Sequence, residues 1–461
     1  MILTHLVNNK ASTSIGGGHV LLACELPRMT RWGKGAANRL LSSLRSAAGQ
    51  PLLGWLLGLK LVYLSLVAFT AWGWGDYDEA ALKAIDAQWF DQNGGGWSLA
   101  KNVAPLARHF ATWDSEHYLY LSQDGYGAGV KSCAFYPLWP LIVRWTAPLA
   151  GGNHLIGGLV VSNLCSLAAW VLFYERVRRR WGASAAGWAL LLLVLFPGSL
   201  FFQFLYSESL FILLVMLLWW GLEERRWGLA WVAASLLPLT RAVGLFAVLP
   251  IAWQALQVAP PVWLVRLRAK RHTRKPMQDL PTPPPDGTQD GRAIAKPCRW
   301  WLLLAGPLAG WAAYLVLMAH WTGNPLEGIE AQKHWGVHSV SNLWNLPKFI
   351  VGFFTPTEWH AFRGSLLDRS SLVLLLYSLP VAWRLDKDLM VWIYVLGILP
   401  AMSGTFTSYT RFASCAFPMF IALGVFLGRP ERRFLRWATV WVFATLHAVL
   451  LWRFVNFRWA G

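Results

Sequence analysis

The chain has 461 residues, of which 56% are hydrophobic and only 14% are charged. Soluble globular proteins carry about 25% charged residues, so this composition excludes an ordinary soluble domain and predicts an all-α, multi-pass membrane protein. The 41 basic residues outnumber the 23 acidic ones, giving a formal net charge of +18. Because the basic residues cluster between apolar runs, they indicate positive-inside loops facing anionic lipid headgroups and not a nucleic-acid partner.

The first predicted part is a basic cytoplasmic leader at residues 1–50, for which we expect no cleavable signal peptide. Its second half is compatible with an amphipathic helix lying on the membrane. The chain then divides into an N-terminal membrane module, a Pro-rich basic cytoplasmic linker and a C-terminal membrane module, at residues 51–253, 254–299 and 300–461, with external loops at 74–152 and 321–369.

Apolar runs of near-bilayer length predict about nine to eleven membrane segments. The 31 tryptophans fit this prediction, since indole rings favour the membrane–water interface. The five cysteines are scattered without CxxC spacing, so they predict neither a disulfide framework nor a zinc site. The segments are expected near residues 51–73, 153–174, 185–204, 205–222, 228–253, 300–320, 370–384, 389–404, 412–428 and 437–453.

The basic loops favour a re-entrant segment at residues 228–253. If this segment crossed the membrane, the basic linker 254–299 would fall outside, against the positive-inside rule. If it breaks at residues 238–241 and returns, every basic loop lies inside. The re-entrant topology also places three polar segments on the external side, at residues 111–127, 321–338 and 405–411.

The segment ATWDSEHYLYLSQDGYG (residues 111–127) is unusually polar for this chain. It predicts a short amphipathic interface helix from Asp114 to Gly125, with His117 one turn beyond Asp114 on nearly the same side. From spacing alone, Asp114 is either a helix cap or a chemically active group. Either reading places a carboxylate at the start of an external helix.

Short motifs stand in order along residues 112–428. They are WDS (113–115), HYL (117–119), DGY (124–126), AFYPLWPL (134–141), FP (196–197), YSESLF (206–211), LTR (239–241), TGNP (322–325) and AFP (416–418). Together they resemble the signature of PIG-V-like mannosyltransferases, similar to GPI mannosyltransferase 2, in which a WDxxxYLxIAxxGY block precedes a FFPLYPLxxR block. That family is of the C-type (GT-C) glycosyltransferase superfamily, so the resemblance implies a GT-C-type transmembrane bundle.

The resemblance implies an enzyme that uses a polyprenyl-phosphate sugar donor and carries an essential aspartate in its first external loop, where Asp114 is the matching position. A carboxylate there can take the proton of an acceptor hydroxyl as general base. The leaving lipid phosphate needs cationic stabilisation, for which Arg411 and Arg241 are the candidates. An interfacial anchor for Arg411 and pairing with helix-end carbonyls for Arg241 remain alternatives.

Other residues of these motifs are expected to bind substrate. Glu208 is either an acid that positions the acceptor or a helix cap, and Asp124 either assists Asp114 or closes the helix. The expected substrate-binding residues are His117, Tyr118, Asp124, Tyr136, Glu208, Gln332, Lys333, Trp335 and Tyr409.

We expect no metal or other cofactor, although some C-type transferases need a divalent ion. His334 and His338 are spaced i, i+4 near Glu327 and Glu330, but without a third tight ligand or an HExxH motif. No Gly-rich motif stands in a strand–turn–helix context, so the sequence does not predict a nucleotide-sugar donor.

The sequence therefore predicts an inverting glycosyltransferase that moves a hexose, mannose by resemblance, from polyprenyl phosphate to a lipid-linked or surface glycan acceptor. The alternatives are a transporter or flippase of lipid-linked sugars and a non-catalytic membrane subunit. The expected location is a bacterial cytoplasmic membrane with an external active site, the alternative being the endoplasmic reticulum membrane with a lumenal site.

Overall fold

The structure, a computed structural model, describes residues 51–73, 75–90, 97–258, 298–335, 346–402 and 406–461. These residues form helices and connecting turns, with a single isolated β-bridge between Glu358 and Ser365 within the described ranges. The all-α prediction is thus confirmed. The predicted leader and most of the predicted linker (residues 259–297) lie outside the described residues.

Five of the described helices are long and apolar enough to cross a membrane. They are α2 (Pro51–Gly73), α8 (His154–Trp181), α14 (Cys298–Thr322), α17 (Leu366–Leu385) and α22 (Arg433–Val455). Shorter helices pack among them, namely α9 (Ala183–Leu195), α10 (Glu208–Glu223), α11 (Trp227–Thr240), α12 (Val248–Val258), α18 (Lys387–Ile393), the π-helix η8 (Tyr394–Ile398), α19 (Leu399–Ala401) and α21 (Phe417–Leu427). The predicted membrane segments are therefore a mixture of full-length helices and helices too short to span a bilayer alone.

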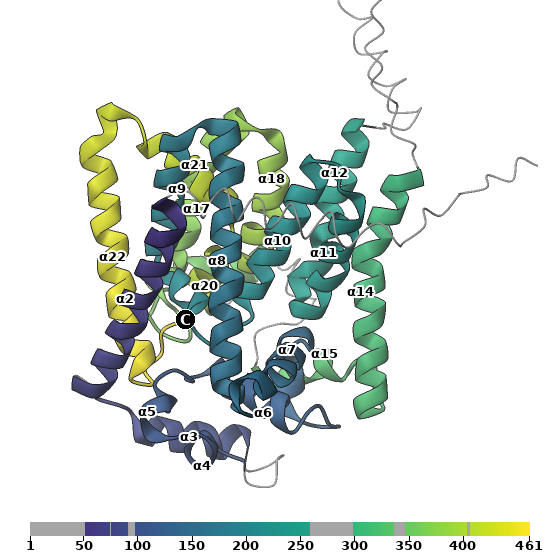
Figure 1. The fold of residues 1–461 in the computed structure, drawn as a ribbon, viewed down its shortest axis with the longest axis vertical. Coiled ribbons are helices and arrows are strands. Elements are labelled where there is room, and N and C mark those ends of the chain that lie inside the picture. The colour runs from purple at the N-terminus through teal and green to yellow at the C-terminus, as the bar shows by residue number, and fades with distance from the viewer. Residues whose placement is uncertain (1–50, 74, 91–96, 259–297, 336–345, 403–405) are drawn as a thin grey trace, which may run out of the picture.

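The remaining helices are short and lie mostly at one end of the bundle, which Figure 1 shows at the bottom. They are α3 (Glu79–Trp89), α4 (Leu99–Asn102), α5 (Pro105–Arg108), α6 (Asp114–Gln123), α7 (Leu138–Thr146), α15 (Glu327–Ala331), α16 (Leu346–Phe354) and α20 (Tyr409–Ala413). Short 3-10 turns lie between helices along the whole bundle, namely η2 (Lys131–Ala134), η3 (Ala147–Ala150), η4 (Pro197–Phe202), η5 (Ala242–Ala247), η6 (Gln332–Trp335) and η9 (Pro430–Arg432).

The opposite end of the bundle carries a network of ion pairs, which we call the arginine-rich end. It begins in the last turn of α8, where basic side chains also complement the helix dipole. Arg176 pairs with Glu224 at 2.6 Å, and Arg180 pairs with Glu223 at 2.7 Å and with Asp386. The positive-inside rule predicts that this end faces the cytoplasm.

Helices α11 and α12 reverse direction at Arg241. Arg226, just before α11, pairs with Glu224 of the arginine-rich end at 2.6 Å. Near the end of α12, the side chain of Gln257 donates to Asp388 of α18 at 2.7 Å. Asp388 is two residues from Asp386, which pairs with Arg180 at the arginine-rich end. The chain therefore returns to the side from which it started, in agreement with the re-entrant topology (Figure 1).

A glycine makes this reversal possible. A Cβ atom on Gly244, in η5, would lie 2.2 Å from the carbonyl carbon of Leu237 in α11. That distance is far below van der Waals contact, so no other residue allows η5 to fold back on α11 so closely. The reversal leaves Arg241 at its innermost point, halfway into the bundle.

The predicted helix of the first external loop is present as α6, but its surroundings differ from the prediction. Eight consecutive residues, 115–122, are buried, so α6 has no face left for solvent or headgroups. It is covered by α7, α8 and η2 as well as by the aromatic side chains of α3. The helix is thus an internal element of the bundle and not an amphipathic helix at the membrane interface.

Candidate active site

Four charged side chains from four separate helical segments meet in the interior of the bundle. We call them the site cluster: Asp114, Glu208, Arg241 and Arg411. Arg411 donates from Nη1 to Asp114 Oδ2 and from Nε to Glu208 Oε1. Arg241 donates from Nη1 to the same Glu208 oxygen, so the four groups form one continuous chain of ion pairs with balanced charge.

Asp114 sits at the first position of α6, and the backbone just before it is strained. Trp113, the N-cap residue, has φ of 57°, a left-handed conformation that costs a non-glycine residue about 1 kcal/mol or more. No side-chain hydrogen bond caps this helix, which rules out the capping alternative for Asp114. The Trp113 ring is held by stacking on Phe457 at 5.0 Å, and its Nε1–H donates to the carbonyl of Arg458.

Arg411 is positioned by a similar device. Its short helix α20 begins after Ser408, which has φ of 57°. The neighbouring amide of Thr410 donates to the buried carboxylate of Asp368 on α17 at 2.6 Å. Gly198 in η4 lets this turn come close, since a Cβ there would lie 2.1 Å from the Thr410 carbonyl oxygen. With only 7% of its side chain exposed, Arg411 is an internal residue and not an interfacial anchor.

Glu208 holds the two arginines together. It is the first residue of α10, behind the N-cap residue Ser207, and makes no capping bond. Its side chain is fully buried, and Oε2 has no hydrogen-bond partner among the described residues. A buried carboxylate bonded to two arginines through one oxygen retains acceptor capacity on the other oxygen.

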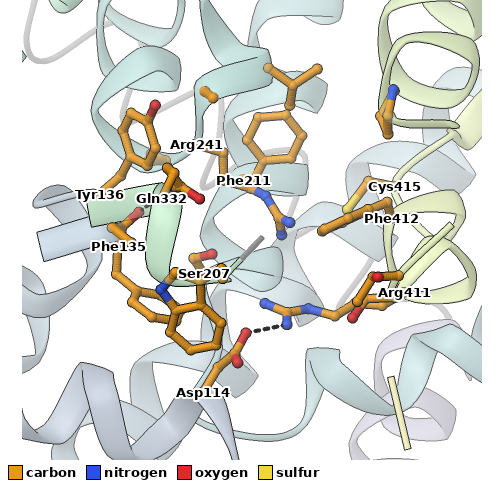
Figure 2. A pocket seen from close by; sticks show the side chains of 18 of the residues that line it. Asp114, Phe135, Tyr136, Ser207, Phe211, Arg241, Gln332, Arg411, Phe412 and Cys415 are labelled. Carbon is orange, nitrogen blue, oxygen red and sulfur yellow. Dashed lines mark hydrogen bonds and ion pairs between the residues drawn. The ribbon is translucent and has the colours of Figure 1, made fainter. Parts of the chain in front are cut away.

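A cavity of about 440 Å³ opens beside the site cluster; we call it the first cavity. Figure 2 shows Arg241 and Arg411 converging on it with Asp114 below, and the ion pair between Asp114 and Arg411. Its remaining walls are mainly apolar and include Phe135, Tyr136, Phe211, Val243, Phe246, Trp311, Leu396 and Phe412. Arg241 also lies over the Phe412 ring, 4.7 Å from its centroid.

A second cavity, of about 360 Å³, also borders Asp114. It is bounded by α3, α6, η6 and the two segments around Phe362 and Trp459. Four residues line both cavities: Asp114, Trp335, Phe362 and Trp459. Neither arginine of the site cluster lines the second cavity.

Most of the residues expected to bind substrate lie around these cavities. Tyr118, Tyr136, Gln332 and Trp335 line the first cavity, and His117 lines the second. Tyr118 donates to Ser207 Oγ at 3.0 Å, and Gln332 donates to the Ala134 carbonyl at 2.7 Å, so both side chains are fixed in place.

His117 is a buried neutral group. Its Nδ1 lies 2.8 Å from Ser132 Oγ, and its ring stacks on Phe135. Burial lowers the pKa of His117 to about 3, so the imidazole is uncharged at physiological pH. It can therefore orient a neighbouring group by hydrogen bonding, without contributing charge.

Three of the expected residues lie elsewhere. Asp124 is the exposed C-cap residue of α6, and Lys333 is exposed on η6, outside both cavities. Tyr409 is buried and donates to the Gly397 carbonyl at 3.0 Å, which is a packing role. The structure therefore does not bring these three residues to the cavities, because a motif identifies a segment, whereas helix rotation decides which of its side chains reach a cavity.

The C-terminal tail was not among the predicted site residues. Trp459 lines both cavities and Phe457 supports Trp113, although both residues follow the last apolar helix and lie outside the family motifs. Topology could have indicated these residues. If α22 is predicted to run outward, the aromatic tail that follows it lies on the same side as the predicted external loops.

Among the described residues, no group of three or more His, Cys, Asp or Glu side chains is arranged to hold a metal ion. His338, half of the predicted i, i+4 pair, lies outside the described residues, and its partner His334 lines the second cavity. The two carboxylates of the site cluster are bonded to arginines.

The family model described as mannosyltransferase (PIG-V) matches residues 84–283. The match covers less than half of the 461-residue chain, which is therefore similar to this family over that segment. The PIG-V segment contains Asp114, Glu208 and Arg241, whereas Arg411 lies beyond it. The five membrane-length helices support an integral membrane protein, and the match makes residues 84–283 similar to mannosyltransferases of the PIG-V family.

Among solved structures, the oligosaccharyltransferase from Archaeoglobus fulgidus, tethered with an acceptor peptide, matches at 12% identity with a TM-score of 0.39. The match covers 88% of this chain and 55% of that one, so this chain spans about half the length of that protein. Among curated proteins, none matches this chain at a significant level.

Proposed function

We propose that the protein is an inverting C-type glycosyltransferase that transfers a hexose, mannose by family, from a polyprenyl-phosphate donor to a glycolipid or glycan acceptor. The observation that carries this proposal is the first cavity, in which two arginines and one carboxylate converge within mainly apolar walls. Such a cavity suits a ligand with a charged head and a hydrocarbon chain. Polyprenyl phosphate has this combination, and a nucleotide sugar does not.

Two arginines provide the cationic groups that the donor phosphate requires. The guanidinium groups of Arg241 and Arg411 are both bonded to Glu208, which fixes their spacing before the donor arrives. Arginine binds phosphate oxygens through paired N–H groups, and its charge does not depend on pH in the physiological range. As the bond to the sugar breaks, negative charge grows on the phosphate, and these preset groups stabilise it.

Asp114 is the proposed general base. The acceptor hydroxyl oxygen attacks the anomeric carbon, its proton passes to the Asp114 carboxylate, and the bond from that carbon to the phosphate oxygen breaks with its electron pair on the phosphate. A single displacement of this kind inverts the anomeric configuration. No cofactor takes part in these steps.

Arg411 couples the two halves of the reaction. In the absence of donor it is bonded to Asp114, which occupies the carboxylate that must accept the proton. A phosphate binding to Arg411 competes with Asp114 for Nη1, so donor binding releases the base. This competition predicts an ordered mechanism in which the donor binds before the acceptor reacts.

The site cluster lies away from the arginine-rich end, toward the end of the bundle formed by the external loops (Figure 1). With the basic loops in the cytoplasm, this geometry supports an active site on the external half of the membrane. The proposed location is a bacterial cytoplasmic membrane.

The test is a transfer assay with the purified full chain in lipid nanodiscs. Radiolabelled polyprenyl-phosphate mannose should support transfer to a mannoside acceptor with inverted configuration, whereas GDP-mannose should not. Use of GDP-mannose, or retention of configuration, would overturn the proposed donor or mechanism. Movement of the donor lipid across vesicles without transfer would instead favour a flippase.

A further inference from the structure

The second cavity is not explained by a lipid-phosphate donor. It contains neither Arg241 nor Arg411, and its arginine, Arg363, is exposed and is not bonded to the site cluster in the described residues, so the paired arginines of the first cavity have no counterpart in it. It nevertheless touches Asp114, the one group of the site cluster that a reacting hydroxyl must reach. The two cavities therefore border the same carboxylate, but the paired arginines line only the first cavity.

The walls of the second cavity are rigid aromatic rings. Trp89 and Trp335 stack on each other at 4.1 Å between centroids, and His117 meets both rings edge-on at 5.5 and 5.0 Å. Across the cavity, Trp113 is held by its stack on Phe457 and meets the Trp459 ring edge-on at 5.1 Å. Because each ring is fixed by another ring, the wall is formed before a ligand arrives.

The rim of the second cavity is polar. Gln88, His334 and Arg363 line it, and all three residues are exposed to solvent. They supply hydrogen-bond donors and acceptors at the outer edge, while the aromatic wall lies deeper. Flat apolar walls combined with a hydrogen-bonding rim match a pyranose ring, which has apolar C–H faces and hydroxyl groups around its edge.

We propose that the second cavity binds the terminal pyranose of the acceptor glycan. The sugar packs a C–H face on the indole wall, its outer hydroxyls contact the polar rim, and one hydroxyl reaches Asp114. This proposal rests on the proposed transferase function and assigns the acceptor to the second cavity, whose rim residues Gln88, His334 and Arg363 do not line the first cavity. The size of the cavity, about 360 Å³, lies within the range of small-ligand sites.

The binding test uses no donor, so it is independent of transfer. Octyl α-mannopyranoside bearing a diazirine is photolysed with the full chain in nanodiscs, and the labelled peptides are identified by mass spectrometry. We expect labelling at Gln88–Trp89 and at His334, none of which lines the first cavity, and this labelling should be suppressed by excess unmodified octyl mannoside but not by octyl glycerol. Labelling confined to first-cavity residues such as Phe211 and Trp311, or no suppressible labelling, would overturn the proposal.

The kinetic test uses rim variants that leave the interior unchanged. Gln88→Ala combined with His334→Ala should raise the KM for a mannoside acceptor at least 10-fold, while the KM for the donor stays within 2-fold of wild type. The matched control is Lys83→Ala combined with His320→Ala, two exposed residues outside both cavities, which should change neither value. An unchanged acceptor KM in the rim variant would overturn the assignment.

The two tests separate the two proposals. If wild-type protein transfers no mannose but the diazirine probe labels the rim, the transferase proposal fails and the sugar site stands. If transfer occurs but the rim variant and the probe show no effect, the sugar site fails and the transferase proposal stands.

Discussion

The molecule contains two networks of arginines and carboxylates, one at each end of α10, and they differ in almost every physical respect. At the arginine-rich end most side chains are partly exposed, with Arg179 at 52% and Arg180 at 37% although Arg176 is buried, and Glu224 forms ion pairs with three arginines. In the site cluster Glu208 is fully buried and Arg411 is 7% exposed. Exposed pairs of the first kind contribute about 0–1 kcal/mol each, because water and salt screen them.

Burial changes the energetics of the site cluster. Removing two ions from water costs several kcal/mol per ion, and their attraction offsets this cost only when the geometry is good and the remaining lone pairs are satisfied. Glu208 Oε2 has no partner among the described residues, and Trp113 and Ser408 adopt left-handed backbone conformations beside Asp114 and Arg411. Because the site cluster has this free-energy cost, we infer a catalytic role for it. The arginine-rich end instead indicates how the protein is oriented in the membrane.

The largest effect should come from Asp114→Asn. This change keeps the shape of the side chain but removes the proton acceptor, so transfer should fall about 100- to 10,000-fold. Donor affinity should stay within about 10-fold of wild type, because both arginines remain. Steady-state transfer rates and donor binding in nanodiscs measure the two quantities, and a near-normal transfer rate would remove Asp114 from the mechanism.

A smaller effect is expected for Arg411→Lys. Lysine keeps the charge but cannot donate to Asp114 and Glu208 at once, as the two arms of the guanidinium do. Loss of one charge-assisted hydrogen bond corresponds to about 1.5–3 kcal/mol, or roughly 10- to 100-fold in donor KM and turnover together. Arg241→Lys is the matched variant and should lose less, since Arg241 bonds only to Glu208 within the site cluster. Equal losses in the two variants would contradict the coupling role of Arg411.

Glu116 sharpens the comparison, because it is as buried as Glu208 but no arginine is bonded to it among the described residues. Burial, and then the negative charges of Asp86 and Asp114, raise the pKa of Glu116 well above its usual range. The neutral form is therefore favoured in the folded state. Its contribution to stability is complete below the ordinary Glu pKa and is lost as pH rises toward the folded-state pKa.

Glu116→Gln should therefore be increasingly more stable than wild type as pH rises from 5 to 8, by about 1 kcal/mol per pH unit or less. Thermal unfolding of both proteins in detergent across this range measures the difference. A stability difference that does not change with pH would show that Glu116 ionises without penalty.

The smallest effect is expected at the arginine-rich end. Arg180→Ala breaks the bonds to Glu223 and Asp386, but all three residues are partly exposed and Glu223 keeps a contact with Arg176. Stability should fall by about 1 kcal/mol or less, and transfer should be unchanged. A loss of transfer comparable to that of Arg411→Lys would mean that the two networks are coupled through α10.

The helices could largely be predicted from the sequence, because hydrophobic runs of fixed length report directly on membrane segments. The predicted segment at 51–73 coincides with α2, and that at 300–320 lies within α14. The break at Arg241 could be predicted as well, because loop charge constrains topology. The internal position of α6 could not be predicted, since its cover comes from α3, α7, α8 and η2, and a single segment does not report its neighbours.

The sequence predicted which segments form the site, but not which of their side chains contact one another. The motifs placed Asp114, Glu208, Arg241 and Arg411 among the candidates, yet they gave no reason for Glu208 to join two arginines 33 and 203 residues away. Such contacts depend on how short helices pack. The C-terminal Trp459 is the clearest omission, because it acts only through its position in space.

The balanced charge of the site cluster has a consequence for the proton. With two carboxylates and two arginines the empty site is neutral, and a bound phosphodiester donor makes it −1. In the proposed reaction the phosphate gains a second negative charge while Asp114 becomes neutral, so the total remains −1 from reactants to products. No ion has to cross the low-dielectric interior during bond exchange, and the proton can wait on Asp114 until the phosphate product departs. The net charge of the site therefore does not change during the chemical step. It changes only when a substrate enters or a product leaves.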